Sequence, residues 1–282
     1  MTRINHNIEA MVSQHSLGLS DRGMRNAMTQ LSTGLRINRA ADDPANLSVS
    51  EQLRSQVRGS SMVTRNAEDA TSLLQIAEGA LDEVSSILQR MRELSVQSSN
   101  DSFTSSDRIY LNQEFQGLKT ELDRIAQSTQ YNGMALLSGS LSAFGSVGGP
   151  SVLHIGVNNH VGVDTLTVSI HSMTSGALAL ITANVLAQPS SDQALLDVDS
   201  AIFSVNETRS YLGSIMNRLD ATVSNLQIQE TNTQAAESVI RDADYAKMVT
   251  EMTRFQILNQ SSMSMLSQAN SLPQSVLSLF KN

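Results

Sequence analysis

The side chains that most often carry out chemistry are few in this chain, and their spacing does not form a site. The sequence has five histidines, no cysteine and no HExxH motif, the helical spacing that brings two imidazoles to one zinc ion. The histidines are His6, His15, His154, His160 and His171. We therefore expect no catalytic residue, no metal site and no cofactor site, and we do not expect an enzyme.

One pair of adjacent carboxylates, Asp42 and Asp43, could be taken for an acid–base pair. Pro44 follows directly, and an aspartate just before a proline is typical of a helix start. The carboxylate accepts hydrogen bonds from free backbone N–H groups, and proline suits the first helical position. The pair is therefore interpreted as a helix cap. Gly34, a few residues earlier, marks the end of the preceding helix.

Charged side chains at 88–97 allow two interpretations. Leu88, Met91 and Leu94 fit a buried helical stripe, so Arg90 and Glu93 lie on the outer face. One interpretation is a solvated charged surface. The other is a contact patch between neighbouring subunits, formed by Gln89, Arg90, Glu93 and Leu94 together with Glu114 on a facing helix.

These residues are carried by long helices with apolar residues in alternating steps of three and four. The first stripe is Ala70, Leu74, Ala77, Leu81, Val84, Leu88 and Met91, and the second is Val198, Ala201, Val205, Thr208, Leu212, Ile215 and Leu219. A repeat of 3.5 residues is typical of helices that pack in a coiled-coil-like bundle. We expect one helix from Pro44 to about Ser98 and another from a cap at Ser190.

A third helix is expected after a polar loop at 98–107, where Thr104 and Asp107 match a capping box. Its apolar residues are Leu111, Phe115, Leu118, Leu122 and Ile125. A short loop after a long helix favours an antiparallel neighbour, so this helix is predicted to fold back on the second one.

The segment 131–189 is the part of the sequence that indicates β structure. Asn132-Gly133 is a turn signal, 165–170 alternates with period two, and 151–155 is a second candidate strand. A short helix or turn is expected at 175–185. The predicted fold is mainly α, a long antiparallel coiled-coil-like bundle with paired N- and C-terminal halves and a small β-hairpin region between them.

Both ends of the chain carry an apolar helical stripe, and the C-terminal one has few charges. Such helices are not stable when exposed, so we expect the two ends to pair with each other and with neighbouring subunits. The residues expected to mediate polymerisation are Ile4, Ile8, Met11, Met28, Leu31, Met248, Met252, Phe255, Leu258 and Leu266.

Charge and hydropathy exclude two classes of partner. A net charge of -8 argues against nucleic acid. No uncharged apolar run is long enough for membrane insertion. The N-terminus also lacks the apolar core of a cleaved signal peptide, so export would proceed without one.

Four segments together resemble bacterial flagellin, the subunit of the flagellar filament. They are LSTGLRINRAADDPA at 31–45, LQRMRELSVQ at 88–97, ESVIRDAD at 237–244 and QSSMSMLSQAN at 260–270. The resemblance covers about residues 1–139 and 190–282. It implies a structural subunit that self-assembles into the filament used for swimming. A hook–filament junction protein of the same wider family is the alternative.

The resemblance also implies an arrangement and a set of partners. Residues 1–40 and 245–282 would form the inner tube of the filament. Residues 41–130 and 190–244 would form a helical rod, with 131–189 as its small β-rich part. Implied partners are other copies of the chain, the flagellar export apparatus and an export chaperone, hook-associated and cap proteins, and the flagellin-sensing Toll-like receptor. That receptor would recognise the patch around Arg90. The expected location is extracellular, in the filament.

Overall fold

The computed structural model describes residues 6–139, 151–160 and 162–279. The chain divides into two compact units, and each is described by itself. The terminal unit comprises residues 1–57 and 232–282, and the central unit comprises 58–231. Five helices and four strands are assigned in the described residues, in the order α1 (Ile8–Thr33), α2 (Pro44–Ser98), α3 (Ser105–Ser128), β1 (Gln130–Tyr131), β2 (Met134–Ala135), β3 (Ser151–His154), β4 (Thr165–Val168), α4 (Gln188–Arg241) and α5 (Tyr245–Leu279).

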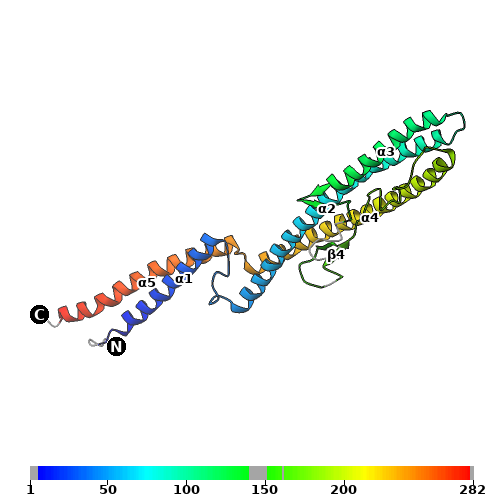
Figure 1. Cartoon of the computed structure of the whole chain (residues 1–282). Helices are drawn as coiled ribbons and strands as arrows, with labels where there is room; N and C mark the ends of the chain where they lie inside the picture. The colour runs from blue at the N-terminus through cyan, green and yellow to red at the C-terminus, as the bar shows by residue number, and fades with distance from the viewer. Residues whose placement is uncertain (1–5, 140–150, 161, 280–282) are drawn as a thin grey trace. The chain divides into compact units, whose positions relative to one another are not determined.

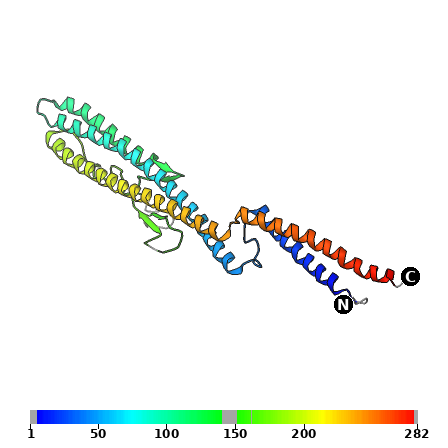
Figure 2. The same ribbon diagram turned by 180° about the vertical axis from the view of Figure 1, so that it is seen from behind.

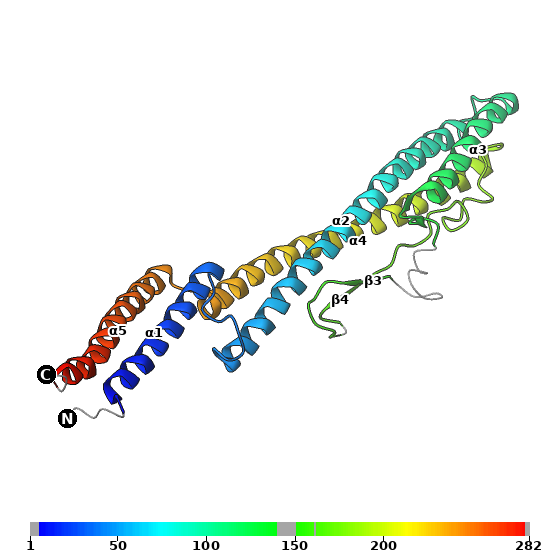
Figure 3. The same ribbon diagram turned by 90° about the vertical axis from the view of Figure 1, so that its left-hand side faces the viewer.

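The core of the central unit lies between α2, α3 and α4, which run alongside one another (Figures 1 and 3). All fourteen residues of the two predicted stripes are buried. On α3, Phe115 and Leu122 are fully buried while Leu111, Leu118 and Ile125 are half-buried. The predicted mainly α, coiled-coil-like bundle with paired N- and C-terminal halves is confirmed, because the 3.5-residue repeat keeps each stripe facing its neighbour.

Two antiparallel hairpins make up the β structure. Asn132 and Gly133 have φ of 49° and 79°, as the type I′ turn between β1 and β2 requires. Strands β3 and β4 pair from Ser151–Val168 to His154–Thr165, and Leu166 and Val168 enter the core of the central unit. The small β region in the middle of the chain is confirmed, and 175–185 forms turns rather than a helix.

Polar contacts fix how α4 lies against α2. Moving along α2, Arg209 contacts Asp82 at 3.1 Å, Asp199 contacts Arg92 at 2.6 Å, and the hydroxyls of Ser98 and Ser191 lie 3.0 Å apart. The partners on α4 run in the opposite direction, so the two helices are antiparallel.

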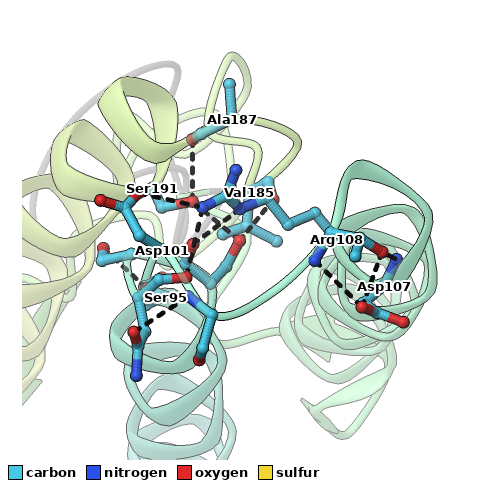
Figure 4. A network of polar contacts seen from close by, with 12 residues as sticks. Ser95, Asp101, Asp107, Arg108, Val185, Ala187 and Ser191 are labelled. Atoms are coloured by element: carbon cyan, nitrogen blue, oxygen red, sulfur yellow. Dashed lines mark hydrogen bonds and ion pairs between the residues drawn. The ribbon is translucent and has the colours of Figure 1, made fainter.

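A polar cluster joins the ends of three helices in the central unit (Figure 4). The Ser98 hydroxyl donates to the carbonyl of Val185 at 2.7 Å, and Arg108 Nε donates to the carbonyl of Ser98 at 3.0 Å. Arg108 therefore places a cation at the C-terminal carbonyls of α2, where the helix dipole is negative. Beside it, the predicted capping box of α3 is confirmed, and hydrogen bonds from Thr104 lower the pKa of the Asp107 carboxyl.

Some helix boundaries differ from the prediction. The cap expected at Ser190 is wrong, because α4 already begins at Gln188 and Pro189 lies within its first turn, where a missing N–H is tolerated. In the structure α4 ends at Arg241 and α5 ends at Leu279. At the other end, α1 begins at Ile8 with Asn7 as its cap.

Truncating a stripe residue should destabilise the central unit far more than truncating an exposed apolar residue of the same helix. Leu81 is fully buried whereas Ile76 is 43% exposed. Leu81→Ala should lower the free energy of unfolding by about 2–5 kcal/mol, and Ile76→Ala by less than about 1 kcal/mol. Urea titration followed by far-ultraviolet circular dichroism measures both, and equal losses would contradict the assigned core.

Candidate assembly surfaces

The terminal unit is built on an antiparallel pair of helices, α1 and α5. The two helices lie side by side in both views from opposite directions (Figures 1 and 2). At one end of the pair the Asn7 side-chain amide donates to the carbonyl of Ala269 at 2.7 Å, and at the other the Ala243 N–H donates to the carbonyl of Gly34 at 2.9 Å. The chain therefore fixes the register of the pair at both ends.

Between these ends, α5 approaches α1 closely at Gly23. A Cβ atom placed on Gly23 would lie only 2.5 Å from Cε1 of Phe255. The aromatic ring therefore rests against the backbone of α1, and Phe255 is half-buried within its own chain. The ring contributes to the pairing of the two helices and is not a freely exposed anchor.

The pair encloses very little apolar surface. Among the described residues of α1 and α5, the buried apolar side chains are Ala27, Met248 and Ala269. Ten large apolar side chains on the same two helices are exposed. They are Ile8, Met11, Val12, Leu19, Met28, Tyr245, Ile257, Leu258, Met263 and Met265.

The residues predicted to mediate polymerisation are distributed over both sides of this pair. Ile8, Met11, Met28 and Leu258 are exposed, Met248 is buried between the helices, and Leu31, Met252, Phe255 and Leu266 are half-buried. Ile4 lies outside the described residues.

Sequence reasoning missed several exposed members of this surface, among them Val12 and Leu19. They follow Ile8, which was predicted, in steps of four and seven, and this spacing places all three on one face of α1. That spacing was available in the sequence. Part of this face opens into a groove between α1 and α5, lined by Ile8, Glu9, Val12, Ser13, Met265, Gln268 and Ala269.

The connection that follows α1 and the connection that precedes α5 are joined by backbone hydrogen bonds. Leu35 and Asp242 form an antiparallel bridge, and the Arg36 N–H donates to the carbonyl of Arg241 at 2.7 Å. The Arg241 side chain, which is 12% exposed, contacts Glu51 at 2.6 Å. Two sequence motifs some 200 residues apart, 31–45 and 237–244, thus meet in one junction.

Within this junction Asp42 and Asp43 have different hydrogen-bond partners. Asp43 accepts from the Asn46 N–H at 3.0 Å and caps α2, as predicted, and this hydrogen bond lowers the pKa of its carboxyl. Asp42 instead accepts from the backbone N–H groups of Asn38 and Arg39. Each carboxylate is held by backbone donors, which explains the adjacent pair without acid–base chemistry.

The central unit places an exposed charged cluster where α2 faces α3. Arg90 lies between two carboxylates, donating to Glu114 Oε1 at 2.9 Å and to Glu93 Oε2 at 2.8 Å. These hydrogen bonds, that to Glu93 first, raise the pKa of the Arg90 guanidinium. Gln89 is exposed next to the cluster. These four residues form one surface, which we call the Arg90 patch.

Leu94 does not belong to the Arg90 patch. Its side chain is fully buried because it continues the stripe that faces the bundle interior, so it cannot contact another molecule while the core is closed. Arg92 lies on another side of α2 and pairs with Asp199 of α4. Two residues along a helix is about 200° of rotation, which explains why neighbouring arginines serve different contacts.

The histidines do not assemble into a site. In residues 6–139, 151–160 and 162–279 the structure contains no group of three or more ionisable side chains placed to hold a metal ion. His160 contacts Asp164 at 3.2 Å, a pairing local to the loop before β4. Over the same residues, none of the helices is both long and apolar enough to cross a membrane.

Two family profiles match the chain at the segments that carry these surfaces. The profile described as the bacterial flagellin N-terminal helical region matches residues 4–142, and the C-terminal counterpart matches residues 195–280. The first match includes α1, α2 and α3, and the second includes most of α4 and all of α5.

Two relatives, among others, match the chain over nearly its whole length. A flagellin of Halalkalibacterium halodurans is 44% identical over 280 residues, which is 99% of each chain. A flagellar filament 33 kDa core protein of Treponema phagedenis is 41% identical over 288 residues, again 99% of each. A solved structure assigned to a flagellar hook-associated protein of Vibrio parahaemolyticus has a TM-score of 0.58 at 19% identity, covering 71% of this chain and 99% of that one. This last likeness concerns the fold.

The close approach of Phe255 to Gly23 predicts opposite effects for two glycine substitutions in α1. Gly23→Ala should weaken the pairing of α1 with α5, because the ring must move to admit the methyl group. Gly18→Ala meets nothing within 4 Å and should strengthen α1 by about 1 kcal/mol through helix propensity.

Amide hydrogen exchange over α1 and α5 distinguishes the two variants. Gly23→Ala should accelerate exchange and Gly18→Ala should slow it. The same response in both variants would show that the contact does not hold the helices together.

Proposed function

This chain belongs to the bacterial flagellin family and is a filament subunit, and from that premise we propose that it polymerises through the exposed apolar surface of α1 and α5. The observation that supports this most directly is the imbalance among the described residues of these two helices, where ten large apolar side chains are exposed and three apolar side chains are buried. An apolar surface of this extent is typical of an interaction site. Charge is sparse too, since α5 holds Lys247, Glu251 and Arg254 as its charged residues.

The form of the contact follows from the shape of this surface. A patch that meets a different patch on the next copy makes a heterologous interface, which extends into a helical filament when the rotation does not close. The α1–α5 groove and the exposed apolar side chains outside it are such unlike patches. We propose that residues 1–40 and 245–282 line the inner tube of the filament, that 41–130 and 190–244 form the rod, and that 131–189 form its small β-rich part.

A filament subunit is favoured over a hook–filament junction protein. The relatives that match the whole chain carry the names flagellin and filament core protein, whereas the hook-associated likeness is limited to the fold. The family is a structural one, and the protein's place is the flagellar filament.

The partners proposed from family membership are those that a filament subunit meets in turn. They are the flagellar export apparatus, a chaperone that covers the C-terminal helix, the hook-associated and cap proteins, and other copies of the chain. We propose export to the cell exterior without a cleaved signal peptide. The chaperone proposal is supported by the exposed apolar residues of α5, among them Ile257, Leu258 and Met265.

A charge placed in the α1–α5 groove should block polymerisation without unfolding the subunit. Val12 lines the groove and is 60% exposed, so Val12→Asp is tolerated in the free subunit but buries an unpaired carboxylate in the filament. The critical concentration for polymerisation should rise at least about tenfold. Sedimentation and negative-stain electron microscopy measure it.

The matched control is Val163→Asp, which introduces the same charge at a 78% exposed loop position of the central unit. It should polymerise like the parent chain. Normal filaments from Val12→Asp, with circular dichroism unchanged, would refute the groove as an assembly surface.

We propose a second role for the Arg90 patch, as a contact between neighbouring subunits and as the surface that the flagellin-sensing Toll-like receptor recognises. The proposal is supported by exposure and geometry. Arg90 and its two carboxylate partners are each between 45% and 67% exposed, and the ion pairs hold the guanidinium in one orientation. An oriented arginine on a stable helix pair is the type of residue that often dominates a protein interface.

Purified, unassembled subunit should activate reporter cells that carry this receptor. Arg90→Ala should raise the concentration needed for half-maximal response at least about tenfold. Arg92→Ala, which removes an exposed arginine that pairs with α4, should have little effect. Silence of the cells toward the parent protein, or equal losses in both variants, would refute receptor recognition at this patch.

A further inference from the structure

Methionine is concentrated in the two terminal helices. Seven of the 13 methionines of the chain lie in α1 and α5, which have 26 and 35 residues. The seven are Met11, Met24, Met28, Met248, Met252, Met263 and Met265. A flexible thioether suits a surface that must pack against a neighbour, but it is also the apolar side chain that oxidants attack most readily.

Exposure differs widely among the methionines of the chain. Met11, Met28, Met263 and Met265 are 64%, 50%, 56% and 61% exposed, and we call them the four exposed terminal methionines. In the central unit Met91 and Met173 are almost completely buried. Met62 in α2 is 55% exposed and provides an internal comparison outside α1 and α5.

We propose that the four exposed terminal methionines are a modification site, at which oxidation by a peroxide to the sulfoxide prevents the free subunit from polymerising. In the reaction the thioether sulfur attacks one peroxide oxygen, the O–O bond breaks, and the second oxygen leaves as water. The sulfur is oxidised by two electrons and the peroxide is reduced by two. A dithiol-dependent reductase reverses the change, releasing the oxygen as water and leaving a disulfide.

The chemistry of the sulfoxide explains why it should block assembly. The side chain changes from apolar to strongly polar, with a new hydrogen-bond acceptor that the filament interior would bury without a partner. Met265 lies in the α1–α5 groove opposite Ile8 and Val12, so its oxidation places the S=O group in a wall that is otherwise largely apolar. The other three extend the effect over both helices.

The inference rests on the proposed function, because it requires α1 and α5 to be the polymerisation surface. It also predicts a difference between two states of the same protein. The thioethers are accessible in the free subunit and covered in the filament, so oxidation acts before assembly and spares the filament.

The first experiment exposes unassembled full-length protein to hydrogen peroxide and locates the sulfoxides by peptide mass spectrometry. The four exposed terminal methionines and Met62 should be oxidised at least about tenfold faster than Met91 and Met173. The critical concentration for polymerisation should then rise at least about tenfold, with helix content unchanged. Treatment with methionine sulfoxide reductase and a dithiol should restore it.

Two leucine variants separate the terminal methionines from the rest. A variant carrying Met11→Leu, Met28→Leu, Met263→Leu and Met265→Leu keeps apolar side chains of similar volume, and its critical concentration should be the same before and after peroxide. Met62→Leu alone should remain as sensitive as the parent chain. The proposal is overturned if the fourfold variant is inactivated as strongly as the parent, if full oxidation leaves the parent's critical concentration unchanged, or if oxidation acts by loss of helix.

The same samples distinguish failure of this inference from failure of the proposed function. If unoxidised parent protein does not polymerise, or if the four methionines react as fast in filaments as in free subunits, α1 and α5 are not the buried assembly surface. If they are protected in filaments and yet oxidised subunits assemble normally, only the oxidation proposal fails.

Discussion

Two helices cannot enclose a core between them. This limit explains why the terminal unit and the central unit of the chain differ in burial. A helix pair buries one narrow stripe along its seam and leaves the remaining surface to solvent. In the central unit a third helix and the segment from β4 to Val185 complete the enclosure, so that Leu74, Leu81 and Leu88 are fully buried. Over the described residues of α1 and α5 no such third layer covers the exposed apolar side chains. The helices α1 and α5 therefore keep ten large apolar side chains exposed among their described residues, and burial has to come from outside the chain.

The core of the central unit is closed in part by an irregular segment, whose backbone N–H and C=O groups need hydrogen-bond partners. The backbone of the turns at 175–185 is not paired within a helix or a sheet. Side chains of α3, spaced at helical steps, form hydrogen bonds with it instead. Val185 donates to Asn112, Gln116 and Lys119 donate to carbonyls between Leu180 and Ala183, and Asp123 accepts from Ser175 at 2.7 Å. Since a buried backbone group without a partner is costly, this row of polar side chains allows a segment without regular structure to cover the core.

The sequence predicted those features that repeat along a helix, and it was weaker where contacts are made by backbone atoms. The two apolar stripes are buried throughout because a 3.5-residue period leaves one face for packing. The caps at Asp43 and Thr104 were identified because their chemistry is local. The cap assigned to Ser190 was wrong because proline is allowed both before a helix and in its first turn. Neither the bridge between Leu35 and Asp242 nor the contact of Phe255 with Gly23 leaves a pattern in the sequence, because each joins residues more than 200 positions apart.

The register of α1 against α5 and the burial of their surface are therefore separate problems. Register is set within one chain, by Asn7 on Ala269 at one end, the Leu35–Asp242 bridge at the other, and the ring of Phe255 between them. A heterologous contact requires this, because a patch matches a different patch on the next copy only if both are held in a defined geometry. Burial of the apolar surface of α1 and α5 is provided by the neighbouring subunit. A subunit that completed its own apolar core at the ends would be more stable alone, and it would have lost the surface that joins it to the filament.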